Sequence, residues 1–573
     1  LELELELELE LELELELELE LELELELELE LELELELELE LELELELELE
    51  LELELELELE LELELDKTIS IDCIRKDDVL RVFDMEQSQI KMVKEEKDWK
   101  PFLRQLLVCS GIWNSCFMSG LSIGTPTVMV PQLRSANVTV SEETASWLPA
   151  ALAYGSIPWI IILSTLTTTI GRKKTHIIVA VSCLIGYSIL YFSKAINHIF
   201  VSQIFQGVNV ASTITTSVII LTEFTSTKYR GIFLTLKSAT IFWGILTANT
   251  IGTFSNWHNI SFLGCFCSVY SLLTVTIWPE SPYWLAGKGK FEDCSKSHMW
   301  LKGNDVETLT ELKNIVKYYQ SEKFDKQNNI RSATKILFSK PSLKPILLSS
   351  LLICLYIFSG KLICMVYAID ILKKIFKDKR TAYTGMLILD CVTVASMYLG
   401  CFLSKILKRR TMLLVFTSMG IMFLFILSGY LYLVKLSKLV ESAYVSISLL
   451  VGYSITMSCG PMIMVACILG ELLPSESKCI FMCINALIFK LMFSTFTKIS
   501  PYFFKYLEIH GTFLLYGILS VVFLVLIYLY IPETKNKTLH EIHESLKWQT
   551  KKSVEEFSEL MPVVVKEHNV THA

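Results

Sequence analysis

Long apolar runs constrain this chain more than any other feature of its sequence. Twelve such runs follow one another between residues 102 and 531, and few charges interrupt them. A run of about 20 residues, coiled as a helix, crosses about 30 Å of hydrocarbon. The pattern predicts an all-α membrane protein and excludes a water-soluble fold. The runs lie near 102–126, 146–168, 176–193, 197–222, 232–254, 260–279, 344–368, 382–404, 411–434, 444–470, 479–503 and 510–531.

The first 65 residues hide the true charge of the chain. They alternate strictly between Leu and Glu, and we interpret them as a low-complexity repeat or an artefact. Of the 66 acidic residues, 32 belong to this repeat, which leaves 34 acids against 51 bases and a net charge of +17 instead of −15. The bases lie in the loops between apolar runs, as topology signals do, so this charge does not predict a nucleic-acid partner.

Polar segments divide the chain into domains. A central loop with a helix over 304–320 separates two halves, since Val306, Leu309, Leu312 and Val316 recur at helical spacing. The predicted order is the repeat 1–65, a cytoplasmic N-terminal tail 66–101, a six-helix bundle 102–279, a cytoplasmic central loop 280–343, a second six-helix bundle 344–531 and a cytoplasmic tail 532–573.

Three charged motifs occur once in each half and in the same order. The first pairs Gly171-Arg172-Lys173 with Arg409, the second pairs Glu223 and Arg230 with Glu471 and Lys478, and the third pairs Pro279-Glu280 with Pro532-Glu533. The copies lie 237 (172 to 409), 248 (223 to 471) and 253 (279 to 532) residues apart. This near-constant period predicts a duplicated unit, with twelve transmembrane helices in two pseudo-symmetric six-helix bundles.

The motifs also suggest an orientation and a role. In the first half the basic loop residues gather on the side of Arg172 and Arg230, which the positive-inside rule assigns to the cytoplasm. The loop after the seventh run carries five bases on the opposite side and conflicts with this assignment. At helix ends, acids and bases of the two halves could pair when the cytoplasmic side closes; the simpler alternative is that they are solvated topology signals.

The same residues resemble the sugar porter family of the major facilitator superfamily, which includes insect facilitated trehalose transporters and animal glucose transporters. The matching motifs are Gly171-Arg172-Lys173, Glu223 to Arg230, Pro279-Glu280-Ser281-Pro282, Gly460-Pro461, Glu471 to Lys478, and Pro532-Glu533-Thr534-Lys535. The resemblance covers roughly 100–545. It implies a major facilitator fold, and transport through a central cavity by alternating access.

Departures from the family pattern concentrate where the resemblance places the sugar. The seventh run keeps Ser359 and Gly360 but has neither the two Gln residues nor the Asn of the family motif. The eleventh run has Phe489-Lys490 where the family has Asn-Trp. The resemblance also implies a uniporter, because the first run lacks the acid of proton-coupled members. Thr168, Gln203, Tyr283, Ser238 and Val465-Ala466 replace further family residues.

Lys361, Asp390 and Lys490 lie inside apolar runs, where an unpaired charge is costly. Lys361 and Asp390 lie at similar depth and could form a pair, or each could face water separately. Lys490 lies near mid-span: facing the cavity it would make the path cationic, and facing another helix it would pair there. We expect a solute path lined by Ser359, Gly360, Lys361, Tyr367, Asp390, Gly460, Pro461 and Lys490, with a helix break at Gly460-Pro461.

The prediction is facilitative transport of a small solute, with a sugar (hexose or trehalose) as first choice. Two alternatives stay open: a transporter-like protein that has lost sugar transport, with a receptor or structural role, and a carrier of an anionic solute. We predict no catalytic residue, metal or cofactor, and a multi-pass plasma-membrane protein whose partners are the solute and the bilayer. Asn137 lies in a glycosylation sequon on the predicted outer side. The oligomeric state does not follow from the sequence.

Overall fold

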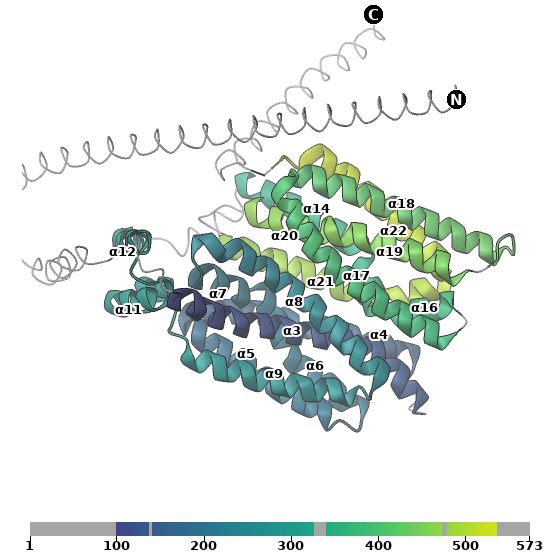
Figure 1. Ribbon diagram of the computed structural model, residues 1–573, viewed down its shortest axis with the longest axis horizontal. Coiled ribbons are helices and arrows are strands. Elements are labelled where there is room, and N and C mark those ends of the chain that lie inside the picture. The colour runs from purple at the N-terminus through teal and green to yellow at the C-terminus, as the bar shows by residue number, and fades with distance from the viewer. Residues whose placement is uncertain are drawn as a thin grey trace, which may run out of the picture. The chain divides into compact units, whose positions relative to one another are not determined.

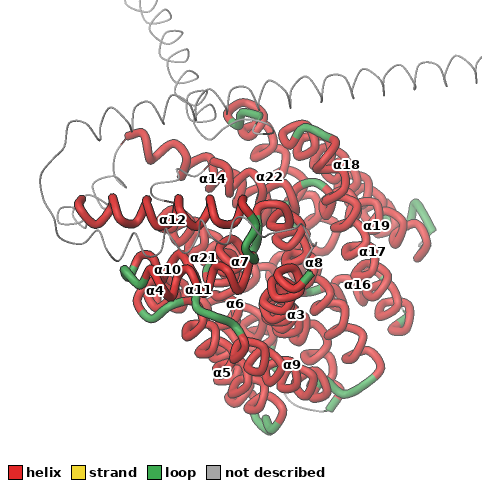
Figure 2. Tube along the Cα trace, turned by 60° about the vertical axis from the view of Figure 1, so that its left-hand side comes forward, coloured by secondary structure: helices red, strands yellow, loops and turns green. Residues whose placement is uncertain are grey.

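Every regular element in the described part of the chain is an α-helix (Figure 2). The computed structural model describes residues 99–136, 140–325, 340–376, 378–440, 442–472, 478–533 and 535. The repeat 1–65, the tail up to residue 98, the Asn137 sequon, residues 326–339 and the tail from 536 lie outside the described residues.

The helices before and after the central loop form two groups (Figure 1). The N bundle consists of α3 (Lys100–Ser135), α4 (Glu142–Thr169), α5 (Arg172–Tyr191), α6 (Ile196–Ile214), α7 (Thr216–Phe224), α8 (Thr227–Phe254) and α9 (His258–Ile277). The C bundle consists of α14 (Lys340–Phe358), α15 (Lys361–Val366), α16 (Ala368–Ile375), α17 (Lys379–Ile406), α18 (Arg409–Lys435), α19 (Ala443–Cys459), α20 (Pro461–Leu472), α21 (Lys478–Tyr506) and α22 (Glu508–Tyr530). Across the interface, α4 packs on α21 and α8 packs on α17.

Length and composition make these helices membrane spans. The described residues contain 11 candidate spans, and the bent pair α6 and α7, with a 40° angle between its parts, brings the number to 12. The predicted fold class is therefore confirmed. Apolar side chains such as Phe262, Phe266 and Leu273 stay exposed along α9, as expected for a surface that faces lipid.

Three spans are broken in the middle. The fourth breaks at Thr215 and the tenth at Gly460, where Pro461 supplies no backbone donor to the preceding turn. The break at Gly460-Pro461 is the one predicted from the sequence. In the seventh span, Gly360 adopts a left-handed conformation with φ 79° and ends α14 before α15 begins.

In the described part of the central loop there are three helices: α10 (Pro282–Gly287), α11 (Phe291–Lys302) and α12 (Val306–Asp325). The last confirms the helix predicted over 304–320. Arg104 and Gln105, in the first turns of α3, donate to the carbonyl oxygens of Trp300 and Leu301 at 2.9 and 3.2 Å, which holds α11 against the N bundle.

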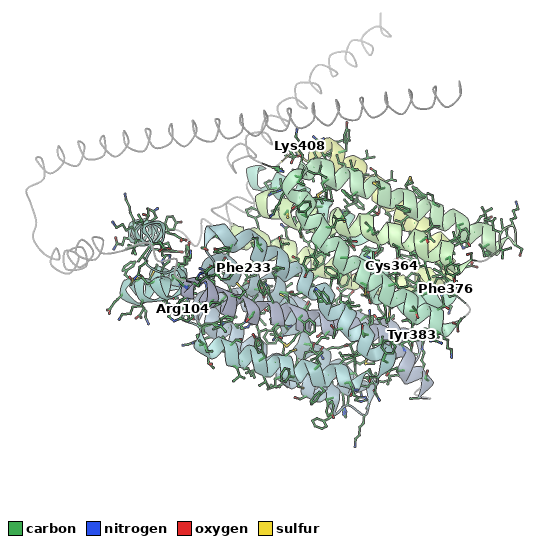
Figure 3. All side chains as sticks on the ribbon, viewed as in Figure 1. Arg104, Phe233, Cys364, Phe376, Tyr383 and Lys408 are labelled. Carbon is green, nitrogen blue, oxygen red and sulfur yellow. The ribbon has the colours of Figure 1, made fainter. Side chains whose placement is uncertain are left out.

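These contacts define two ends of the molecule. The loop face is the end that carries α10 to α12 and the start of α3, where Arg104 lies; the far face is the opposite end, toward Phe376 and Tyr383 (Figure 3). At the far face α4 begins and α21 ends, and Lys505 Nζ lies 3.1 Å from Glu142 Oε2 there.

Candidate functional site

Two adjoining cavities lie between the bundles. The Asp370 cavity spans about 260 Å³ and the Lys490 cavity about 320 Å³, and both volumes include space that is open to solvent. Both are walled by α3 and α4 of the N bundle and by the seventh span of the C bundle, and they share Pro126, Pro149 and Val366. A space that lies between two bundles and contacts both is the arrangement that alternating access requires.

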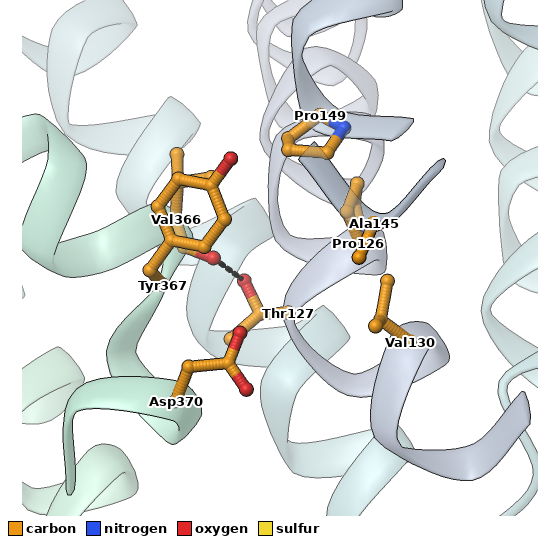
Figure 4. Close-up of a pocket in the computed structure, with 8 residues that line it drawn as sticks. All are labelled: Pro126, Thr127, Val130, Ala145, Pro149, Val366, Tyr367 and Asp370. Carbon is orange, nitrogen blue, oxygen red and sulfur yellow. Dashed lines mark hydrogen bonds between the residues drawn. The ribbon is translucent and has the colours of Figure 1, made fainter. Parts of the chain in front are cut away.

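A hydrogen bond between the bundles lies in the wall of the Asp370 cavity (Figure 4). Thr127 Oγ1 donates to the carbonyl oxygen of Val366 at 2.8 Å, and the carboxylate of Asp370 lies beside this pair. Tyr367 lines the same space, and its hydroxyl donates to the carbonyl oxygen of Thr497 at 3.0 Å. The remaining lining residues are Pro126, Val130, Ala145, Pro149 and Val366.

Lys361 and Asp390 are both buried, but each has partners of its own. Lys361 Nζ donates to Thr393 Oγ1 at 2.9 Å and to Ser454 Oγ at 2.5 Å. Asp390 Oδ2 accepts from Asn249 Nδ2 of the N bundle at 2.6 Å. Among the side chains that the structure describes, no nitrogen–oxygen contact within 4.0 Å joins Lys361 to Asp390, so the direct pair considered from the sequence is not formed.

The other residues expected along the path are not lining residues of these two cavities. The hydroxyl of Ser359 donates back to the carbonyl oxygen of Tyr356 at 2.9 Å, and Gly360 packs against the ring of Tyr516. Gly460 packs against Phe416 at the break of the tenth span. Neither Gly460 nor Pro461 lines the two cavities. Of the eight expected residues, only Tyr367 and Lys490 line a cavity.

At the loop face of the N bundle, the first charged motif meets the second and the third. Arg172 Nε and Nη2 donate to the two carboxylate oxygens of Glu223 at 2.8 and 2.7 Å, a fork geometry that only Arg provides. Glu280 accepts from the backbone N–H groups of Arg172 and Lys173 at 2.7 and 3.2 Å. A carboxylate at these free donors stabilises the start of α5.

The C bundle repeats this arrangement. Glu533 accepts from the backbone N–H groups of Arg409 and Arg410, both at 3.1 Å, at the start of α18. Lys173 donates to the carbonyl oxygen of Trp278 at the end of α9. Arg410 donates to that of Tyr528 in the last turn of α22. Each six-helix unit thus connects its third helix to its own last helix.

These contacts differ from the pairing between bundles considered from the sequence. Arg172, Glu223, Glu280 and Glu533 each form the hydrogen bonds described above within their own bundle. The reason is the connectivity, because each Pro-Glu motif follows the last helix of its bundle directly. Arg230 donates to the carbonyl oxygen of Thr225 at 3.4 Å. Glu471 lies in the last turn of α20, and Lys478 is the first residue of α21. Their side chains lie outside the described residues.

A compact ionic cluster also holds the central loop together. Glu311 on α12 accepts from Lys302 at 2.6 Å and from Tyr283 at 2.9 Å, and His298 Nε2 lies 3.6 Å away. Burial opposes ionisation, but the contacts of His298, Lys302 and Tyr283 outweigh it and lower the pKa of Glu311 to about 2. The ionised carboxylate joins α10, α11 and α12.

Sequence reasoning missed the residues that join the bundles. Asn249, Thr127 and Ser146 are ordinary polar residues within or directly beside apolar runs. Asp370 is followed closely by Lys373 and Lys374, so its charge did not stand out in the sequence. A small polar residue repeated at helical spacing within a span was the available signal, since such residues favour helix–helix contacts in membranes.

Comparison with known sequences gives a consistent assignment. The model of the family described as "Sugar (and other) transporter" matches residues 89–546. The facilitated trehalose transporter Tret1 of Bombyx mori is 26% identical over 454 residues, covering 78% of this chain and 87% of the relative. Tret1 of Aedes aegypti is 23% identical over 517 residues, covering 84% of this chain and 62% of that longer protein, so this chain spans less than two thirds of it.

Solved structures show the same fold. The partially occluded inward-open xylose transporter XylE from E. coli aligns with a TM-score of 0.62 at 17% identity, covering 76% of this chain and 99% of that one. The proton:xylose symporter XylE bound to 6-bromo-6-deoxy-D-glucose aligns with a TM-score of 0.63 at 16% identity, covering 77% and 98%.

Proposed function

We propose that this chain carries a small organic solute across the membrane by alternating access. The chain belongs to the sugar (and other) transporter family. It is a multi-pass membrane protein rather than an enzyme. The observation that supports the proposal most directly is the pair of cavities walled by both bundles. In the proposed cycle the two bundles rock as rigid bodies around these cavities, and the solute is exposed to one face at a time.

The charged clusters have a defined part in this proposal. Each cluster connects the third helix of a bundle to the end of its last helix, so that the bundle moves as one body. The contacts that must break are those between the bundles, such as Thr127 to Val366 and Asn249 to Asp390. Exposed ion pairs are worth only about 0–1 kcal/mol each, so the buried contacts carry more of the bias between states.

Hexoses and trehalose are the solutes to test first, because relatives named as trehalose transporters share the family. The experiment is uptake of labelled glucose and trehalose by the purified full chain in liposomes. Saturable uptake that Gly460→Leu slows strongly supports the proposal, because a leucine side chain at the break would collide with Phe416. The proposed uniport predicts that an imposed proton gradient does not drive accumulation.

A second candidate is a transporter-like protein without sugar transport, acting as a receptor or a structural protein. The observation that favours it is the loss of the family's amide residues at the seventh span, where Tyr356, Ile357 and Leu362 now stand. Measured binding of glucose or trehalose without any uptake would favour this reading. If the chain neither binds nor takes up glucose or trehalose, the result indicates a different solute.

The proposed topology places both tails and the loop face in the cytoplasm, in the plasma membrane. It rests on the bases near Arg172 and Arg230. It places Asn137 outside, as a glycosylation site. Protease access to the central loop in sealed vesicles of known orientation tests this arrangement.

A further inference from the structure

Lys490 has no hydrogen-bonding partner although it is almost fully buried. It is 5% exposed and projects from the middle of α21 into the Lys490 cavity. Among the side chains that the structure describes, none accepts a hydrogen bond from its ammonium group, and the nearest electrostatic contact is the ring of Phe489 at 5.6 Å. A charge kept at membrane depth without a partner is costly, which makes a functional role the default reading.

Lys361 shows what a satisfied lysine looks like in the same protein. It is 4% exposed, and two hydroxyl groups accept from its ammonium group, those of Thr393 and Ser454. Both lysines therefore lie at membrane depth in the C bundle, but only Lys361 has its acceptors built in. The acceptor of Lys490 must come from what enters the cavity.

The walls around Lys490 define the rest of such a molecule. Apart from Lys490, no lining side chain carries a hydroxyl, amide or carboxylate group. A neutral sugar would bury several hydroxyl groups there without partners, at a cost of about 1–3 kcal/mol each. The other lining residues are Ile123, Pro126, Pro149, Leu152, Ala153, Val210, Val366 and Phe493.

We propose that the Lys490 cavity is a binding site for a small organic monocarboxylate, whose carboxylate pairs with Lys490 and whose apolar body contacts the surrounding side chains. The inference rests on the proposed function, because it takes this cavity as part of the solute path. It deepens that proposal by naming the substrate class. A single cation in an apolar cavity favours one negative charge per solute.

Calorimetric titration of the purified full chain in detergent tests the site without requiring transport. The probes are benzoate and pivalate, each compared with its neutral amide. We expect both carboxylates to bind at least tenfold more tightly than the amides. Lys490→Met keeps an unbranched side chain one heavy atom shorter and removes its charge, so it should lower carboxylate affinity at least tenfold and leave the weak amide binding unchanged. Lys505→Met removes an exposed charge at the far face and should leave all affinities unchanged.

Two results would overturn the site. One is equal affinity of acids and amides, or binding of neither acid; the other is unchanged carboxylate affinity in Lys490→Met. Thermal unfolding of Lys490→Met without ligand verifies folding, and its midpoint should equal or exceed that of the wild type, because an unpaired buried charge is removed. Glucose or trehalose uptake by the full chain tests the transport proposal independently of this titration, so failure of the carboxylate site and failure of the transport proposal are distinguishable.

Discussion

At the scale of single residues, the break in the seventh span depends on Gly360. Its φ of 79° is unfavourable for any residue with a Cβ, and an added Cβ would lie 2.2 Å from Cδ2 of the buried Tyr516. We expect Gly360→Ala to destabilise the protein by about 2–4 kcal/mol, seen as a lower midpoint of thermal unfolding in detergent. Gly429→Ala is the control, because nothing lies within 4 Å of its added methyl group. Equal midpoints for the two variants would contradict this assignment.

Single residues were also where sequence reasoning reached its limit. Counting along a helix gives the depth of Lys361 and Asp390, and that estimate allowed a pair. It does not give the rotation of each helix or the partner that a third helix supplies. Asn249 of α8 donates a hydrogen bond to the carboxylate of Asp390, and Ser454 of α19 accepts one from the ammonium group of Lys361. Both partners come from distant parts of the chain.

At the scale of elements, the duplicated motifs were the most informative part of the sequence. Their repetition predicted the same number of helices in each half. In the structure, Glu280 and Glu533 follow the last helices of equivalent six-helix units and make equivalent contacts. Proline chemistry located the break at Gly460-Pro461. The matching break at Thr215 has no proline and no strong local signal, so the sequence did not predict it.

The central-loop helices should separate in acid. Because contacts in the folded state lower the pKa of Glu311 to about 2, from 4.5, its ionised form stabilises the cluster above about pH 4.5. That contribution, about 1–3 kcal/mol for a partly buried group, is lost as the pH falls toward 2. Hydrogen exchange of α12, corrected for intrinsic rates, should therefore accelerate as the pH falls from about 4.5 to about 2.

The matched variants for this experiment are Glu311→Gln and Glu292→Gln. Glu311→Gln removes the charge at the centre of the cluster, so α12 should exchange rapidly at every pH. Glu292 pairs with Lys296 on the exposed side of α11, and its replacement should change little. Exchange of α12 that is independent of pH in the wild type would show that Glu311 does not hold it.

At the scale of the whole molecule, the proposed cycle requires that the contacts between the bundles determine which face is open. The fold of each bundle followed from the sequence, but the interface did not, because it is built from isolated polar residues on α3, α4 and α8. At the far face, Lys498 Nζ donates to Ser146 Oγ at 2.7 Å and lies 4.3 Å from the ring centroid of Trp147. Both partners lie in the first turns of α4, so Lys498 on α21 holds the two bundles together there.

Replacing Lys498 with Met should release this face. The hydrogen bond and the cation–π contact together contribute about 1–2 kcal/mol, which corresponds to a shift of about tenfold in the balance between closed and open states. A cysteine introduced at Val130, which lines the Asp370 cavity, should react about tenfold faster with a maleimide in Lys498→Met than in the parent, as measured by mass spectrometry of that site. Lys505→Met breaks only the exposed pair with Glu142 at the same face, and should change the rate less than twofold. If both variants react at the parent rate, the interface of α4 with α21 does not control access to the cavity.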